Sequence, residues 1–167
     1  MMIEKNTCRI AALVVLYLLL AQASIAADPP MARSVGQTVY VPIYSHIYSG
    51  DRERPVYLAA TLSIRNVQSE GAILITRVAY YNSDGKLLKN YLDAPLELPE
   101  MASIRYVVKQ SDKEGGSGAN FIVEWRSPRK VVPPLIESVM ISTQNQQGIS
   151  FSSRGRVVSE RDGKSQK

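Results

Sequence analysis

The chain has 167 residues, of which 45% are hydrophobic and 21% are charged, and its formal net charge is +5. That length is enough for one domain with a hydrophobic core of its own. The single histidine and the single cysteine exclude a metal site built from several imidazoles or thiolates, and they leave one histidine to serve as a catalytic base.

The first 27 residues have the composition of a secretory signal peptide. Lys5 and Arg9 lie in a polar start, Ile10 to Leu20 is an unbroken apolar run, and Ala21 to Ala26 offers the small residues that a signal peptidase needs. The run lies within the roughly 7–15 residues typical of such signals, and a membrane span needs roughly 20. We therefore expect residues 1–27 to be cleaved, which leaves no stable membrane span.

Cleavage predicts an exported protein, with an extracellular location or a retained N-terminal membrane anchor as alternatives. Cys8 is the only cysteine, and it precedes the apolar run, so it cannot serve as a lipoprotein cysteine. Its removal leaves a chain without disulfides, which is more typical of the bacterial periplasm than of an animal extracellular space. The expected location is therefore the periplasm, and we expect no nucleic acid as a partner.

The remaining chain is expected to consist of a linker, one domain and a C-terminal tail. Residues 28–37 contain Pro and Gly without a hydrophobic period and are expected to be a flexible linker. Residues 159–167 are polar and charged and are expected to be disordered. Residues 38–158 alternate short β-branched or aromatic runs with turn residues. This pattern predicts a single all-β domain, an immunoglobulin-like antiparallel β-sandwich of about eight strands, with a small β-barrel as the alternative.

Turn residues separate the expected strands. Asn82 to Gly85 predicts a tight hairpin turn, because Asp-Gly readily supplies a positive φ. Pro95 and Pro99 bracket a short run that we expect to be a connection or an edge, since proline lacks the ladder donor. The runs expected as strands are residues 38–43, 56–66, 73–81, 86–92, 103–109, 121–125, 135–141, 149–151 and 156–158.

The apolar phase of these strands predicts the core. Trp125 shares its phase with Phe121 and Val123, and large aromatic side chains on an apolar strand face usually bury. The expected core residues are Leu58, Leu62, Ile64, Val78, Ile104, Val108, Phe121, Val123, Trp125, Val139 and Ile141.

Aromatic residues occupy alternate positions near the start of the domain. If the chain is extended here, Tyr40, Tyr44, His46 and Tyr48 share one face. Such a row can stack on sugars or bind a partner, and it can equally pack beneath a loop. Pro42 belongs to the same set and predicts that this strand lies at an edge, where another chain could add to the sheet.

A glycine-rich loop and a basic C-terminal segment are further candidates. The loop could hold an anion on its backbone N–H groups, although glycine loops are also common connections between strands. Arg154 and Arg156 could add positive charge toward an anionic glycan. The candidate loop residues are Gly115, Gly116, Ser117, Gly118 and Asn120.

The sequence contains no recognisable catalytic, metal or cofactor motif. His46 would have to act as the base of any Ser-His-Asp set, and Glu124 and Glu137 could hydrolyse a glycoside only if they meet. We therefore expect no catalytic residue, no metal and no cofactor. The favoured function is a non-catalytic periplasmic binding or interaction module whose partner is an envelope protein or an anionic glycan. A structural or chaperone-like component of an envelope assembly is the alternative, and a hydrolase is less favoured.

Five segments in the same order resemble one bacterial family. They are Val39 to Tyr48, Thr61 to Asn66, Tyr80 to Lys86, Gly115 to Trp125 and Gly148 to Arg156. In these blocks the chain is similar to the family known as domain of unknown function 3124, which is found in exported bacterial proteins. The resemblance implies the domain boundaries and a bacterial origin, and it implies no activity, cofactor or catalytic residue.

Overall fold

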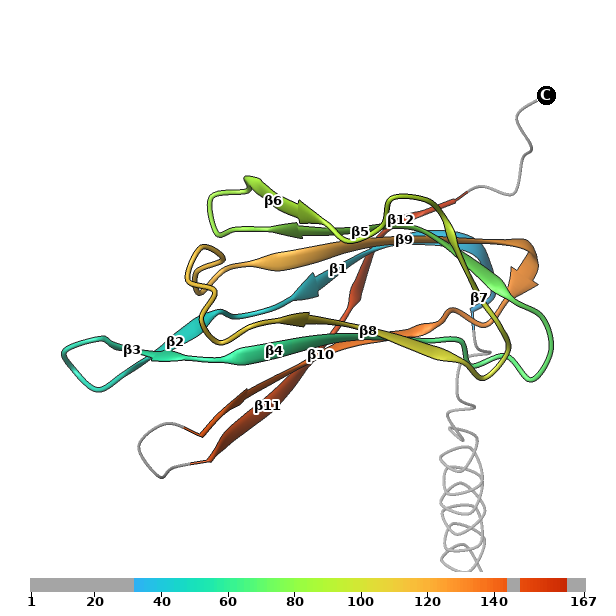
Figure 1. Cartoon of the computed structure of the whole chain (residues 1–167). Helices are drawn as coiled ribbons and strands as arrows, with labels where there is room; N and C mark the ends of the chain where they lie inside the picture. The colour runs from blue at the N-terminus through green and yellow to red at the C-terminus, as the bar shows by residue number, and fades with distance from the viewer. Residues whose placement is uncertain (1–31, 144–147, 162–167) are drawn as a thin grey trace, which may run out of the picture. The chain divides into compact units, whose positions relative to one another are not determined.

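The structure is a computed structural model that describes residues 32–143 and 148–161. The regular elements in these ranges are twelve strands in three antiparallel sheets (Figure 1). The expected signal peptide, residues 1–27, lies outside the described residues. Within the described ranges, no helix is long and apolar enough to cross a membrane.

The two larger sheets form the layers of a β-sandwich, as the sequence predicts, and each remains open (Figure 1). The six-stranded sheet has the order β12-β1-β9-β5-β6, and β7 pairs with the other end of β5. Its strands are β1 (Ser34–Pro42), β5 (Ile73–Tyr81), β6 (Leu87–Asn90), β7 (Leu96–Leu98), β9 (Asn120–Val131) and β12 (Arg156–Glu160).

The opposite layer is a four-stranded sheet with the order β11-β10-β4-β8. A separate hairpin of β2 and β3 extends beyond one end of the sandwich (Figure 1). The strands are β4 (Ala59–Arg65), β8 (Ser103–Val108), β10 (Leu135–Ser142), β11 (Ile149–Arg154), β2 (His46–Ser49) and β3 (Arg54–Tyr57).

The core lies between the two larger sheets and follows the alternation of their strands. On β9, Phe121, Val123 and Trp125 point inward and are almost completely buried. The facing sheet contributes Leu62 and Ile64 of β4 in the same way. The expected core residues that are buried are Leu58, Leu62, Ile64, Val78, Val108, Phe121, Val123 and Trp125, and Ile104 is half-buried.

The prediction that Val139 and Ile141 lie in the core is wrong. Both are exposed, because β10 turns its other face inward and buries Ile136 and Met140. Ser138 shares that inner face, and its hydroxyl donates to the Pro42 carbonyl of the opposite sheet at 2.6 Å. Apolar residues occur on both faces of β10, so the period of two does not identify the buried face.

The prediction that Pro42 marks an edge strand is also wrong. β1 lies between β12 and β9, so it is an inner strand of the six-stranded sheet. Pro42 is the last residue of β1, and the pairing with β12 already ends at Tyr40. Proline is tolerated here because no partner strand on that side requires its missing N–H.

The regular structure extends beyond both ends of the expected domain. Residues 34–37, expected in the linker, belong to β1, and residues 159–160, expected in the tail, belong to β12. Hydrogen bonds join the two ends of the domain. The Glu160 carboxylate accepts one hydrogen bond from Ser34 Oγ and one from Gln37 Nε2, each at 2.6 Å. These contacts are polar, so a search for apolar periodicity does not detect them.

At Gly155 the chain crosses from one layer of the sandwich to the other. This glycine separates β11 in the four-stranded sheet from β12 in the six-stranded sheet. Its N–H donates to the Ile136 carbonyl at 2.8 Å. A Cβ at this position would lie 2.6 Å from Val39 Cγ1 and 2.9 Å from that carbonyl oxygen, so the crossing requires glycine.

We expect Gly155→Ala to lower the free energy of unfolding by roughly 1–3 kcal/mol, as other overpacked sites do. Gly148→Ala is the matched control, because a Cβ there meets no atom within 4 Å. Chemical denaturation of the two variants measures the difference. Equal stability of both variants would show that the crossing is not closely packed.

Candidate binding surface

The expected aromatic row is divided among three places. Tyr40 lies on β1 directly opposite Arg156 of β12. The chain leaves the sheet after Pro42, and Tyr44 then packs against Phe151 of β11 with 5.8 Å between ring centroids. Only the last two members of the row, both on β2, lie side by side.

His46 and Tyr48 form an aromatic cluster on the β2–β3 hairpin. His46 Nε2 is 3.1 Å from the Tyr48 hydroxyl, and its ring centroid is 5.9 Å from that of Tyr57. Lys113 Nζ lies 4.9 Å from the centroid of the Tyr57 ring. Tyr48 is 56% exposed. These contacts give His46 a packing role on an exposed hairpin.

The glycine loop closes one end of the sandwich. Ser83, in the turn after β5, donates its N–H to the Gly115 carbonyl at 2.9 Å and accepts at Oγ from the Gly118 N–H at 2.8 Å. Ser117 is half-buried in the loop, and Asn120 is the first residue of β9. The hydrogen bond from Gly118 therefore attaches the loop to its own domain.

Close packing explains the two neighbouring glycines. A Cβ at Gly115 would overlap the hydroxyls of Tyr80 and Ser45, and Gly116 has a φ of 81°. The Ser45 N–H donates to the Gly116 carbonyl at 3.0 Å, and the Ser45 and Tyr80 hydroxyls are 3.1 Å apart. The loop thus covers a buried pair of hydroxyl groups.

The two candidate arginines belong to different layers although they are two residues apart. Arg154 lies opposite Glu137 in the four-stranded sheet. Arg156, on the far side of the crossing at Gly155, lies opposite Tyr40 in the six-stranded sheet. Residues directly opposite in an antiparallel pair share a face, so Arg156 and Tyr40 lie together on the outer surface.

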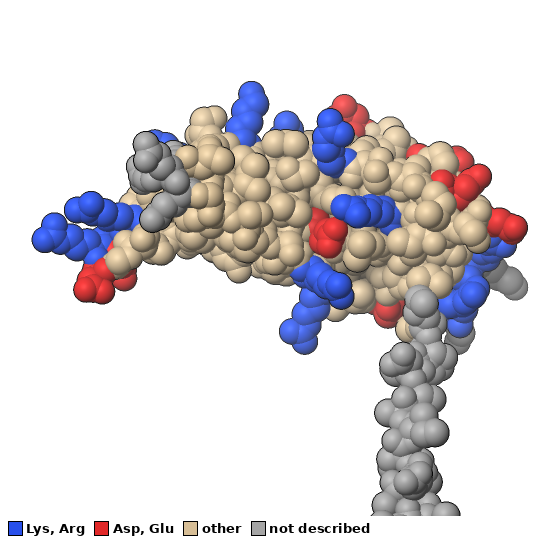
Figure 2. All heavy atoms as spheres, turned by 90° about the horizontal axis from the view of Figure 1, so that it is seen from below, with Lys and Arg blue, Asp and Glu red and all other residues tan. Residues whose placement is uncertain are grey.

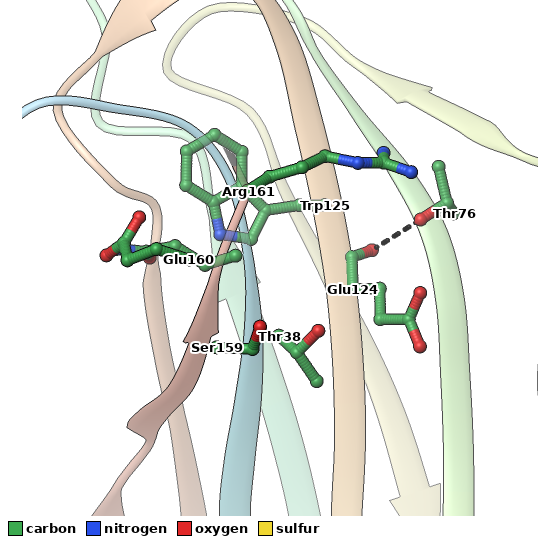
Figure 3. Close-up of a pocket in the computed structure, with 8 residues that line it drawn as sticks. Thr38, Thr76, Glu124, Trp125, Ser159, Glu160 and Arg161 are labelled. Carbon is green, nitrogen blue, oxygen red and sulfur yellow. Dashed lines mark hydrogen bonds between the residues drawn. The ribbon is translucent and has the colours of Figure 1, made fainter. Parts of the chain in front are cut away.

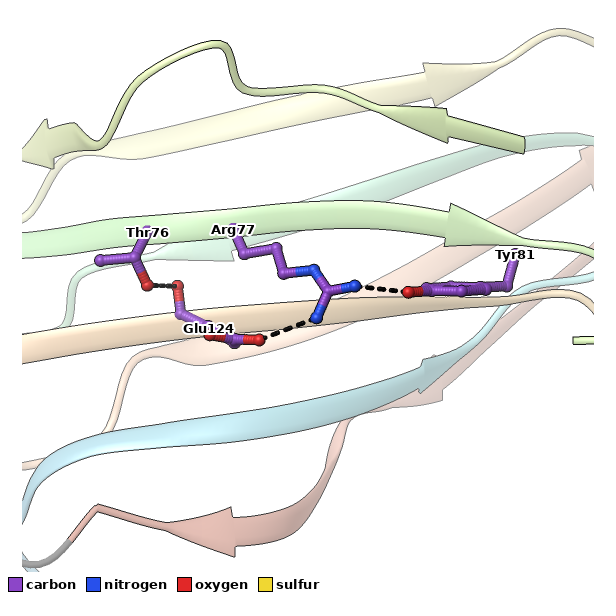
Figure 4. A network of polar contacts seen from close by, with 4 residues as sticks. All are labelled: Thr76, Arg77, Tyr81 and Glu124. Carbon is purple, nitrogen blue, oxygen red and sulfur yellow. Dashed lines mark hydrogen bonds and ion pairs between the residues drawn. The ribbon is translucent and has the colours of Figure 1, made fainter. Parts of the chain in front are cut away.

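A polar network occupies the middle of the six-stranded sheet's outer face (Figure 4). Arg77 Nη1 donates to Glu124 Oε1 at 3.0 Å, and Arg77 Nη2 donates to the Tyr81 hydroxyl. Thr76 Oγ1 donates to the Glu124 carbonyl at 3.2 Å. The guanidinium is therefore held between a carboxylate and a phenol and lies along the sheet.

Sequence reasoning missed this network because a register shift creates it. The pairing of β5 with β9 shifts between Ile75 and Arg77, so Thr76 and Arg77 both lie beside Glu124. The alternation of β9 does place Glu124 outward, opposite to Val123 and Trp125. It carries no information about which residue of β5 lies opposite.

A small polar pocket of about 170 Å³ adjoins the network (Figure 3). Glu124 belongs to both, and the Arg161 side chain extends across the pocket toward Thr76 in that view. The lining offers hydroxyl, carboxylate and guanidinium groups, which suits a polar ligand. The lining residues are Gln37, Thr38, Thr76, Glu124, Trp125, Ser159, Glu160 and Arg161.

Positive charge exceeds negative charge on this outer face and in its pocket. The carboxylates are Glu124, Glu160 and Glu97, which lies on β7 opposite Leu74 and so shares a row with Arg126. Glu124 and Glu160 already accept hydrogen bonds from neighbouring side chains. Four arginines against these three carboxylates give 4 − 3 = +1. The arginines are Arg77, Arg126, Arg156 and Arg161.

The structure does not bring together Glu124 and Glu137, the two carboxylates that could hydrolyse a glycoside only if they met. Glu124 lies on β9 in one layer, and Glu137 lies on β10 in the other layer, where it pairs with Arg65 at 3.4 Å. Each strand turns its opposite face to the core, so the two carboxylates lie on opposite outer faces. In residues 32–143 and 148–161, no group of three or more His, Cys, Asp and Glu side chains is placed to hold a metal ion.

The fold and this surface define a β-sandwich domain with a polar, arginine-rich outer face. Residues 36–158 match the family described as Protein of unknown function (DUF3124), and the chain belongs to that family. This confirms the resemblance found in the sequence. No curated protein matches the chain. A solved structure, "Crystal Structure of Thermotoga maritima 1070", is similar with a TM-score of 0.44 and 12% identity over 72% of this chain and 92% of that one.

The buried Tyr80 hydroxyl predicts an alkaline loss of stability. Burial raises the pKa of Tyr80 from 10.0 to about 12, although its hydrogen bond with Ser45 lowers it. The folded state therefore favours the neutral phenol, so this contribution is complete below pH 10.0 and is lost as the pH rises toward 12. Two pKa units correspond to about 2–3 kcal/mol at most.

We expect Tyr80→Phe to remove much of this alkaline loss in the free energy of unfolding, measured by urea denaturation between neutral pH and pH 12. Burial also raises the pKa values of Tyr91 and Tyr106, so part of the loss remains. Tyr48→Phe, at an exposed position, is the control and keeps the wild-type profile. An unchanged profile for Tyr80→Phe would contradict the assignment.

Proposed function

We propose that the domain is a non-catalytic binding module of the bacterial periplasm, and that it binds an anionic, hydroxyl-rich ligand of the glycan class. The binding surface is the outer face of the six-stranded sheet. The observation that carries this proposal is the Arg77 guanidinium, held between Glu124 and Tyr81 beside a pocket lined by hydroxyl groups.

The charge of the surface supports an anionic ligand. Arg77 is already paired with Glu124, which fixes its position at 40% side-chain exposure. Arg156 and Arg161 lie on the same side of the domain, and their guanidinium groups match the geometry of a carboxylate or a phosphate. A surplus of arginine on an open sheet therefore favours acidic groups repeated along a polymer.

The aromatic and hydroxyl groups support a sugar rather than a simple anion. Tyr40 and Tyr81 lie on strands that flank β9, opposite Ile122 and Asn120, so they are separated by about 10 Å across the sheet and about 7 Å along it. Their rings offer apolar faces with polar tips, and Thr38 and Ser159 add hydroxyl groups between the charges. An extended chain of sugars can contact all of these groups at once.

The engaged state of the carboxylates supports a binding role over hydrolysis. Glu124 is ion-paired with Arg77 at 3.0 Å, and Glu160 accepts hydrogen bonds from Ser34 and Gln37. A glycosidase needs one carboxyl group free to donate a proton and a second one to act as base or nucleophile. Neither carboxylate of this pocket is free of such partners.

Calorimetric titration with polygalacturonate, an acidic polysaccharide, tests the proposal on the chain without residues 1–27. The described residues from 32 onward form a compact unit of their own, which justifies this form of the protein. We expect binding of polygalacturonate and none of the neutral polysaccharide dextran. Arg156→Gln should weaken the affinity about tenfold, since a charge-assisted hydrogen bond contributes roughly 1.5–3 kcal/mol.

Arg105→Gln is the matched control, because Arg105 is also an exposed arginine on a strand but lies on β8 in the other layer. It removes the same charge and should leave the affinity unchanged. Equal weakening by both substitutions would show nonspecific attraction to a basic protein. Absence of polygalacturonate binding, or equal binding of dextran, would contradict the proposed ligand class.

A further inference from the structure

Exposed aliphatic side chains gather on the outer face of the four-stranded sheet. Val107, Val139 and Ile141 are 50%, 36% and 47% exposed. Val139 and Ile141 are two residues apart on β10, Thr61 of β4 lies between Val139 and Val107, and Ala59 lies opposite Ile141. Together with Thr61 and Ala59 they form one largely apolar area, which we call the aliphatic face, and such areas usually mark contact surfaces.

The middle of the aliphatic face is uncharged. On β11, the residues opposite Val139 and Ile141 are Ser152 and Ser150. Figure 2 views the molecule from this side and shows a broad uncharged area with Lys, Arg, Asp and Glu side chains around it. The next register row, which runs from Arg154 through Glu137 to Arg105, carries the charges, so they lie toward one end.

A hollow of about 510 Å³ lies at the charged end of the aliphatic face. Val67 and Met101 line it and are 42% and 73% exposed, so the apolar surface continues past the end of the strands. Met101 has a φ of 55°, an unusual value for a residue other than glycine. The turn thus exposes a large apolar side chain at the border of the same face.

We propose that the aliphatic face binds a second copy of this chain, so that two four-stranded sheets pack face to face around a twofold axis. Sheets bury apolar faces readily in this way, about 10 Å apart. Four strands of six to eight residues present an area of roughly 20 by 25 Å, so that two copies bury about 1,000 Å². That area reaches the lower limit for a specific interface.

The distribution of charge favours self-association over other occupants. If the twofold axis runs along the uncharged rows, the charged rows of the two copies lie at opposite ends of the interface. Like charges then do not meet. The centre offers no ion-pair partner for a charged protein surface. It also lacks the Trp and Lys side chains typical of segments that lie in a membrane interface.

The proposed dimer leaves both six-stranded sheets on the outside. Each copy would then keep the face that carries Arg77 and Tyr40 open to solvent. Two such faces on one particle can engage one polymer at two points, which raises the apparent affinity without a new contact. Dimer formation itself does not depend on the proposed ligand, so the two proposals can fail separately.

Sedimentation equilibrium over a concentration series, without ligand or lipid, tests the proposal on the chain without residues 1–27. We expect the wild-type protein to form a dimer and Val139→Asp to weaken the dimer about tenfold or more, because it buries an unpaired carboxylate. Val107→Asp, on the neighbouring strand β8, should have the same effect. Circular dichroism checks that both variants remain folded.

Val158→Asp is the matched control, because Val158 is 57% exposed and lies on β12 in the other layer. It should leave the dimer intact. A wild-type protein that stays monomeric at every concentration would overturn the proposal. A dimer that survives both Val139→Asp and Val107→Asp, or one that only Val158→Asp disrupts, would also overturn it and place the contact elsewhere.

Discussion

The close approach of the chain at Gly155 determines how the two layers are joined. At this residue the backbone passes from β11 to β12 with no room for a Cβ between Val39 and Ile136. The crossing places β12 beside β1 and thereby turns β1 into an inner strand. It also delivers Arg156 and the end of β12 to the outer face of the six-stranded sheet. A packing constraint in the interior thus supplies part of the proposed binding surface.

The central strand β9 contributes residues both to the core and to the candidate site. Its inward residues, including Trp125, lie in the core, while Glu124 points outward and holds Arg77. β9 is paired with β1 on one side and with β5 on the other. The ion pair therefore rests on a backbone that the core holds in place. Such support is what a preorganised binding site requires.

The strands that bury one face were predictable from the sequence, because alternation alone places their side chains. Residues 73–81 form β5 with the expected bounds, and the expected turn at Asn82 to Gly85 follows them. Alternation failed at β10, where Val139 and Met140 are both apolar and only tertiary packing selects the buried one. It failed again for the candidate site, because cross-strand register and a register shift in β5 are properties of the assembled sheet.

The two outer faces of the sandwich differ in charge and polarity, and the overall composition does not show this difference. The net charge of +5 is a sum over the whole chain, whereas the six-stranded sheet exposes arginines around Glu124 and the middle of the four-stranded sheet exposes Val and Ile. Burying the second face would remove apolar surface from water without desolvating the charges of the first. The same segregation means that the proposed ligand on the arginine-rich face and the proposed second copy on the aliphatic face would not compete. Opposite faces of one thin sandwich can therefore carry two independent interactions.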